Sequence, residues 1–263
     1  MTDLRERLPA QALMEKVASL RGTSDFIELP LGIVKPSKAG LNWLRGIRGE
    51  LKMAERLWYL GAGWTVLHSV PVGNRGSDID HLVIGPGGVF TINSKRLIDR
   101  RIWVAGGKFL VDGRNRDYLR NSEYEGRRVA SVLDRSGLSV SVTPVIAISG
   151  ATSITVKDAP SWNGVPVWVL DVNSLAPIIR GGATVLSPHD VVRITQVCSE
   201  PGTWSRQAAL DDVDAVAEVR RVYDLIDRGT TRWNVFIVAI ALAFATVVVL
   251  VTPTILSALL SRH

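Results

Sequence analysis

The stretch that most constrains the fold of this chain is DIDHLVIGPGGVFTINSK at positions 78–95. Two runs of apolar and β-branched residues flank Gly-Pro-Gly-Gly, a pattern that is typical of a β-hairpin with a tight turn. If the turn is symmetric, Gly85 lies opposite Gly88, and the numbers of facing residues sum to 173. A bulge would shift this register by one residue. The sequence therefore predicts both a hairpin and its register.

The polar side chains of this hairpin gather at its open end. Because side chains alternate along a strand, Asp78 and Asp80 share one face, and so do Asn93 and Lys95. The register places Asp80 opposite Asn93 and Asp78 opposite Lys95. Directly opposed Cβ atoms lie about 5 Å apart, close enough for two oxygen-bearing side chains to hold one hard cation. Two interpretations stay open: a cation site, or an ordinary polar hairpin end with an Asp–Lys pair.

The elements around the hairpin predict a mixed sheet covered by helices. Apolar residues at helical spacing predict a helix over 41–60, and a strand follows at 64–72. A second, smaller hairpin should turn at 106–107, and the next helix should be capped by Asn121 or Ser122. Two buried strands and two further helices follow. This order of helices and strands predicts an α/β fold.

The C-terminal part carries an apolar run, VFIVAIALAFATVVVLV at 235–251, that contains no charged residue. The apolar region continues to Leu260, and about 20 such residues suffice to cross the hydrocarbon core of a membrane. Four arginines between 220 and 232 precede the run, and Arg262 follows it. Positive residues stay in the cytoplasm. We therefore expect a single-pass protein of the cell membrane with a cytoplasmic N-terminal part.

Composition gives weaker constraints. The formal charge of +6 suits an anionic partner, either nucleic acid or lipid headgroups, and does not choose between them. The single cysteine, Cys198, excludes an intramolecular disulfide, and the scarcity of Cys and His argues against a zinc site. We expect four segments: an N-terminal extension at 1–40, a folded domain at 41–205, a charged helical stalk at 206–232 and a transmembrane helix at 233–260.

Several motifs occur in a fixed order from Gly46 to Lys95. The predicted helix carries Gly-x-x-Gly-Glu, the first strand of the hairpin carries Ile-Asp-His, its turn is Gly-Pro-Gly-Gly, and the second strand closes on x-x-Lys. In this order and spacing the chain resembles the nuclease-related domain (NERD) family, most of all its actinobacterial members. The similarity continues, more weakly, to about Trp204. The resemblance implies a restriction-endonuclease-like PD-(D/E)XK core, an α/β fold with a mixed sheet flanked by helices.

The resemblance also implies a Mg²⁺ site that hydrolyses phosphodiester bonds of nucleic acid. Asp80 matches the aspartate that binds the metal in this superfamily, and Asn93 and Lys95 match its (D/E)-x-Lys motif. Glu50 matches the glutamate on the first helix. Lys95 and Glu50 are therefore the catalytic candidates. The metal-ligand candidates are Asp80, Asn93 and Asp78, the last as a carboxylate that can compensate for the amide.

Asn93 departs from the family pattern, because an amide oxygen can bind Mg²⁺ but brings no charge. Two functions remain open: a membrane-anchored Mg²⁺-dependent nuclease, or a non-catalytic module that binds nucleic acid or protein at the membrane. Cations after the hairpin could contact phosphates, or they form a solvated or lipid-facing surface. The candidates for nucleic-acid contact are Arg96, Arg100, Arg101 and Asn121.

Overall fold

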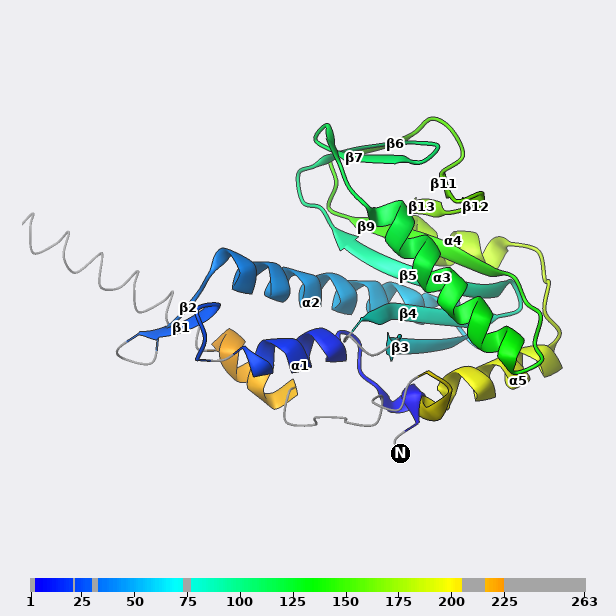
Figure 1. Cartoon of the computed structure of the whole chain (residues 1–263), viewed down its shortest axis with the longest axis horizontal. Coiled ribbons are helices and arrows are strands. Elements are labelled where there is room, and N and C mark those ends of the chain that lie inside the picture. Colours follow the sequence, from blue (N-terminus) through cyan, green and yellow to red (C-terminus); the bar gives the residue numbers. More distant parts are fainter. Residues whose placement is uncertain (1–2, 21, 30–32, 73–76, 205–215, 225–263) are drawn as a thin grey trace, which may run out of the picture.

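A mixed five-stranded sheet lies at the centre of the computed structural model, which describes residues 3–20, 22–29, 33–72, 77–204 and 216–224 (Figure 1). The strand order is β13-β9-β5-β4-β3. The strands are β3 (Thr65–Pro71), β4 (Asp78–Gly85), β5 (Gly88–Arg96), β9 (Val142–Ser149) and β13 (Trp168–Asp171). β13, β9 and β5 run parallel, whereas β4 runs antiparallel to β5 and to β3.

Helices cover both faces of this sheet. They are α1 (Gln11–Ser19), α2 (Lys38–Leu57), α3 (Tyr118–Arg135), α4 (Val172–Gly181) and α5 (Pro188–Ser199). Side chains of α2 and α4 pack with Val83 and Phe90 on one face. Those of α3 and α5 pack with Leu82 and Ile84 on the other face, so alternate residues of β4 belong to different cores. The predicted α/β class, a mixed sheet flanked by helices, is confirmed.

Smaller elements surround this core. A second sheet has the order β10-β6-β7-β8, and Figure 1 shows its hairpin beyond the edge of the main sheet. Its strands are β6 (Arg101–Ala105), β7 (Lys108–Val111), β8 (Arg114–Asn115) and β10 (Ser153–Val156). Two short pairs are β1 (Phe26–Leu29) with β2 (Ile33–Pro36), and β11 (Ser161–Trp162) with β12 (Val165–Pro166). The 3₁₀ helices are η1 (Leu4–Glu6), η3 (Trp58–Leu60) and η4 (Pro201–Thr203). Ala105 pairs with Lys108, which confirms the predicted turn at 106–107.

The central hairpin has the predicted register. Gly85 pairs with Gly88, and His81 pairs with Ile92. A Cβ atom at Gly85 would lie 2.2 Å from the indole ring of Trp64, so a side chain at this position would force the ring to move. The ring of Trp64 therefore packs directly on the backbone at the first residue of the turn, and the register leaves no bulge between the turn and Ile92.

The predicted start of α3 is wrong. The helix begins at Tyr118, with Asp117 at the N-cap position, and not after Asn121 or Ser122. The backbone N–H of Asn121 already donates a helical hydrogen bond to the carbonyl of Asp117, 3.0 Å away. Arg120 also pairs with the Asp117 carboxylate, at 3.0 Å. A polar residue of a type that often caps helices can therefore lie one turn inside a helix when an earlier acidic residue takes the N-cap position.

The C-terminal part is described only over residues 216–224, which are helical. Val219 and Val222 of this helix are buried against a core that includes residues of α1 and α2. Tyr223 donates a hydrogen bond of 2.9 Å to the carbonyl of Leu44 in α2. The predicted transmembrane helix lies outside the described residues, as does most of the predicted stalk. Among the helices that are described, none combines the length and the apolar character that crossing a bilayer requires.

Candidate metal centre

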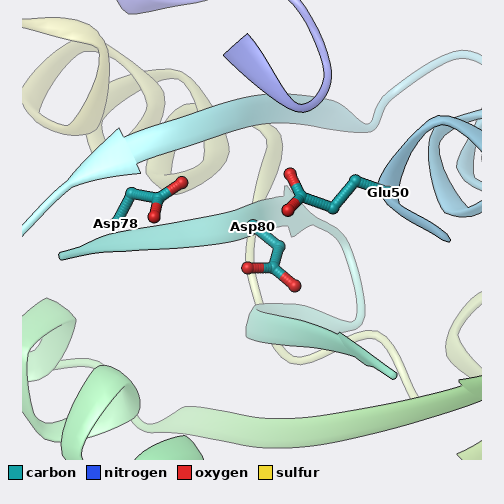
Figure 2. A group of neighbouring side chains, drawn as sticks. All are labelled: Glu50, Asp78 and Asp80. Carbon is teal, nitrogen blue, oxygen red and sulfur yellow. The ribbon is translucent and has the colours of Figure 1, made fainter. Parts of the chain in front are cut away.

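Three acidic side chains converge where β4 begins. Figure 2 shows Glu50 reaching from α2 toward Asp78 and Asp80 of β4. One carboxylate oxygen from each of the three lies within 4.8 Å of the others. This is the only such group of three in the described part of the chain. Asp78 and Asp80 were predicted from the hairpin, and Glu50 was predicted from the Gly-x-x-Gly-Glu motif on the preceding helix.

The glycines of the helix motif bring Glu50 to the sheet. A Cβ atom at Gly49 would lie 3.3 Å from Cβ of Arg96, so α2 and β5 approach each other closely beside Glu50. Ile47 and Met53, on the same buried side of α2, are almost fully buried, and Glu50 itself is only 4% exposed. A hydrogen bond with the backbone of Ala10 also stabilises the Glu50 carboxylate. The Gly-x-x-Gly-Glu motif thus places an acid in the helix–sheet interface.

The hairpin orients Asp80 through its partner strand. The pairing of β4 with β5 extends from the turn to His81–Ile92, and Asp80 is the next residue of β4. The backbone N–H of Ser94 donates a 2.6 Å hydrogen bond to Oδ2 of Asp80. A hydrogen bond of this kind stabilises the charged form of a carboxyl group. Asp80 is therefore held by the backbone, and does not depend on a flexible side-chain partner for its position.

Lys95 is the cation of the centre. Its Nζ donates a 3.2 Å hydrogen bond to the carbonyl of Ser94 and lies 5.4 Å from the centre of the Tyr118 ring, at the start of α3. Its positive charge lowers the pKa of both Asp80 and Glu50. The ammonium group therefore faces the carboxylates electrostatically, while the ring of Tyr118 restricts where it can move.

A fourth buried acid, Glu125 of α3, lies beside this centre, and the sequence patterns did not reveal it. Nδ2 of Asn93 donates a buried hydrogen bond of 2.5 Å to Oε1 of Glu125. The signal that could have found Glu125 is its helical spacing. It lies on the side of α3 that carries the buried residues Leu119, Ser122 and Val129, where an acidic side chain is unusual.

Burial and mutual repulsion raise the pKa of these acids. Burial, followed by the charges of Asp80 and Asp78, raises the pKa of Glu50 well above its ordinary value. Burial, followed by the charge of Asp80, raises the pKa of Asp78 to about 7. Burial also raises the pKa of Asp80, against the opposing effects of Lys95 and Ser94. The group needs either protons or a cation to balance its charge.

The oxygen atoms of the centre fit a hard divalent cation. Four of them are buried and have no hydrogen-bond partner in the described structure: Glu50 Oε2, Asp78 Oδ2, Asn93 Oδ1 and Glu125 Oε2. Leaving a buried acceptor without a donor is costly, and the cost is larger for a charged group. Mg²⁺ and Ca²⁺ take oxygen ligands from carboxylates and amides. The donor set, which is all oxygen, therefore suits such an ion better than it suits zinc, whose protein sites are built mainly on histidine nitrogen and cysteine sulfur.

A cleft of about 390 Å³ opens onto the acids. Leu13 of α1 and Trp43 of α2 line one part of it, and Asp80, Lys95 and Arg96 line another. Its volume lies within the range of small-ligand sites. Cationic and acidic side chains thus meet in a cavity that a polar ligand can enter, beside the group of unpaired oxygens.

A comparison with protein families agrees with this geometry. Residues 45–149 match the nuclease-related domain (NERD). These residues form a nuclease-related domain. The matched range contains Glu50, Asp78, Asp80, Asn93 and Glu125. Separate comparisons with curated proteins and with solved structures found no match for the chain.

The four residues that the sequence suggested for nucleic-acid contact lie at different places in the nuclease-related domain. Arg96 is half-buried and lines the cleft beside the acids. Arg100 is exposed and bonds to Asp112 at 2.9 Å, and Arg101 is exposed on β6. Asn121 lines a different pocket of about 380 Å³, together with Tyr124 and other residues. The structure therefore brings Arg96 to the acidic centre of the domain, but not the other three.

His81 lies away from the centre, as the alternation along its strand predicts. It is fully buried, and its Nδ1 lies 2.8 Å from Nδ1 of His68 on β3. Burial lowers the pKa of His68 to about 4 and the pKa of His81 well below its ordinary value, so both rings are neutral near pH 7. The two histidines form a cross-strand pair that links β3 to β4 in the nuclease-related domain.

Proposed function

We propose that this protein is a Mg²⁺-dependent nuclease that hydrolyses phosphodiester bonds of nucleic acid. The observation that supports this most is the convergence of Glu50, Asp78 and Asp80 within a nuclease-related domain, beside Lys95. Unpaired buried oxygens favour a divalent cation there, and Lys95 and Arg96 give the adjoining cleft the charge that an anionic substrate needs.

We assign the core to the restriction-endonuclease-like PD-(D/E)XK class. The order α2, β3, β4, β5, α3, β9 supports this, with acids on α2 and β4 and the lysine on β5. The parallel pairing of β5 with β9, after the antiparallel hairpin, also agrees with the mixed sheet of that class. The departure at position 93 is the feature that this assignment has to explain.

In the mechanism that we propose, Glu50, Asp78 and Asp80 would hold Mg²⁺ through carboxylate oxygens, and Asn93 would add its amide oxygen. Mg²⁺ held by these residues would supply a Lewis acid that activates water for attack and offsets negative charge on the scissile phosphate. Lys95 orients the attacking water and donates hydrogen bonds as charge develops on the phosphate oxygens. Arg96, on the wall of the cleft, binds a neighbouring phosphate of the substrate.

A second function, a binding module without catalysis, is favoured by a different observation. Asn93 uses its amide nitrogen to bind Glu125, and the raised pKa of the acids allows protons to neutralise the centre in place of a metal. Such a domain would bind nucleic acid through cations such as Arg96 without cutting it. Both functions predict binding, so cleavage separates them.

The test is a cleavage assay with full-length protein on single- and double-stranded DNA and RNA, with Mg²⁺ or with EDTA. We expect cleavage with Mg²⁺ alone, and we expect Asp80→Asn and Lys95→Ala to abolish it. The control is Asp158→Asn, which removes an exposed carboxylate elsewhere and should leave cleavage intact. Wild-type protein that binds these nucleic acids but never cuts them would favour the binding module.

We also propose that residues 235–251 anchor the protein in the cell membrane, with the nuclease-related domain in the cytoplasm. The length of the apolar run and the arginines that precede it support this. Reporter enzymes fused to each terminus would test the topology. An N-terminal reporter that is active only outside the cytoplasm, or full-length protein that fractionates without membranes, would contradict it.

A further inference from the structure

The pair Asn93–Glu125 joins two elements that are far apart in the sequence. Asn93 lies on β5 and is 7% exposed, and Glu125 lies on α3 and is 8% exposed. Their hydrogen bond of 2.5 Å is enclosed within the protein. A carboxylate is expensive to bury, and one amide donor offsets little of that cost. A purely structural contact at this place would be better made by two apolar side chains.

Each member of the pair keeps one buried oxygen without a hydrogen-bond donor. These are Asn93 Oδ1 and Glu125 Oε2, and both residues are more than nine-tenths buried. Because the Asn93 amide nitrogen is already used on Oε1 of Glu125, neither unpaired oxygen is satisfied by that contact. Two unpaired acceptors on partners so close together require a cation, a proton or a water molecule beside them.

The pair borders the three acids of the metal centre. Asn93 directly precedes Ser94, whose backbone N–H donates a 2.6 Å hydrogen bond to Asp80. The negative charge of Asp80 raises the pKa of Glu125, and the positive charge of Lys95 lowers it, so the Glu125 carboxyl lies among the charged groups of the centre. Glu50 approaches from α2, whereas Glu125 approaches from α3, on the opposite side of the sheet. The acids therefore enclose the centre from both layers of helices.

We propose that Glu125 supplies the negative charge that Asn93 lacks. Asn93 holds the Glu125 carboxylate with its amide nitrogen and directs its own oxygen to the metal. The acidic group expected on β5 is thereby replaced by an amide on β5 and an acid on α3. This inference rests on the proposed function, because it assigns a further residue to the same metal centre. Glu125 is a positioning and charge-balancing residue for that metal.

The test measures Mn²⁺ binding to full-length protein by isothermal titration calorimetry at pH 8. We expect Glu125→Gln to weaken binding at least about tenfold, the scale of losses around metal ligands. We expect the double variant Asn93→Asp with Glu125→Gln to bind within a few-fold of wild type, because it exchanges the acid and the amide and keeps the hydrogen bond. The matched control is Glu123→Gln, which removes another buried acid of α3 that pairs with Arg127.

The outcomes separate this inference from the proposed function. Wild-type protein that does not bind Mn²⁺ would overturn both. Wild-type protein that binds Mn²⁺ equally well with Glu125→Gln would overturn the role of Glu125 alone. A double variant as weak as Glu125→Gln would also overturn it, since the restored charge would then be irrelevant. Thermal melting of every variant shows whether it folds. If Glu125→Gln does not fold, the comparison of the double variant with wild type still tests the exchange of acid and amide.

Discussion

At the scale of single residues, the centre is a competition between protons and a cation for the same oxygens. Burial and the charge of Asp80 raise the pKa of both Glu50 and Asp78, and the charge of Asp78 raises the pKa of Glu50 further. A divalent ion reverses that effect, because its charge favours the ionised form of each ligand. The raised pKa values and the fit to a metal are therefore two consequences of one arrangement.

This competition predicts that metal binding depends on pH. The pKa of Asp78 is about 7 in the folded protein against 3.8 for an ordinary aspartate, so its contribution to stability without metal is lost as the pH rises from about 4 through 7. Mg²⁺ should offset this loss once the proton has left. We expect Mg²⁺ to raise the melting temperature clearly at pH 8 and little at pH 5. An equal response at both pH values would contradict this account.

The sequence revealed part of the centre because strands repeat every two residues. The symmetry of one turn predicted the pairing of β4 with β5, and the register agrees with it from Gly85–Gly88 to His81–Ile92. Glu125 was missed because its distance from Asn93 depends on how α3 packs on β5, which no local pattern records. Arg7, whose charge lowers the pKa of Asp78, was missed for the same reason.

At the scale of elements, close approaches at glycine determine where the polar groups lie. The ring of Trp64 occupies the Cβ position of Gly85, and Cβ of Arg96 lies only 3.3 Å from the Cβ position of Gly49. The glycines of Gly-x-x-Gly-Glu and Gly-Pro-Gly-Gly therefore allow neighbouring elements to pack closely, and those of the second motif also form the turn. Sequence patterns predicted α2 and the hairpin well, whereas the start of α3 was misplaced because several residues near it can act as caps.

Gly85 should be intolerant of a side chain. Gly85→Ala places Cβ 2.2 Å from the ring of Trp64, so the ring or the strand has to shift, at a cost of roughly 1–3 kcal/mol. The control, Gly107→Ala in the second hairpin, meets no atom nearer than 3.9 Å and should change stability by less than about 0.5 kcal/mol. Urea unfolding of both variants measures the difference. Equal stabilities would show that Trp64 is free to move.

At the scale of the whole molecule, both ends of the described chain pack around α2. Leu13 of α1 lines the cleft, and a core shared with α1 buries Val219 and Val222 from residues 216–224. The sequence predicted a helical stalk over 206–232, and its described part, residues 216–224, is helical. The sequence did not predict which surface this helix covers, because that depends on contacts between residues about 180 positions apart.

The packing of residues 216–224 predicts a stability effect at Tyr223. Its hydroxyl bonds to the carbonyl of Leu44, and the guanidinium of Arg48 lies 5.1 Å from its ring centre. Tyr223→Ala removes both contacts and buried ring area, so we expect a loss of about 2–4 kcal/mol in urea unfolding. Asp224→Ala, at the exposed neighbouring position, is the control and should be near neutral. A neutral Tyr223→Ala would mean that this helix does not hold to α2 in solution.

The measurement that tests the metal centre most directly is an anomalous difference map from crystals of the protein grown with Mn²⁺. We expect a peak in contact with carboxylate oxygens of Glu50, Asp78 and Asp80, because those oxygens already lie within 4.8 Å of one another. The map from crystals of the Asp80→Asn variant, grown in the same way, should show no such peak. A wild-type map without a peak there, while Mn²⁺ is bound at another place, would contradict the central claim.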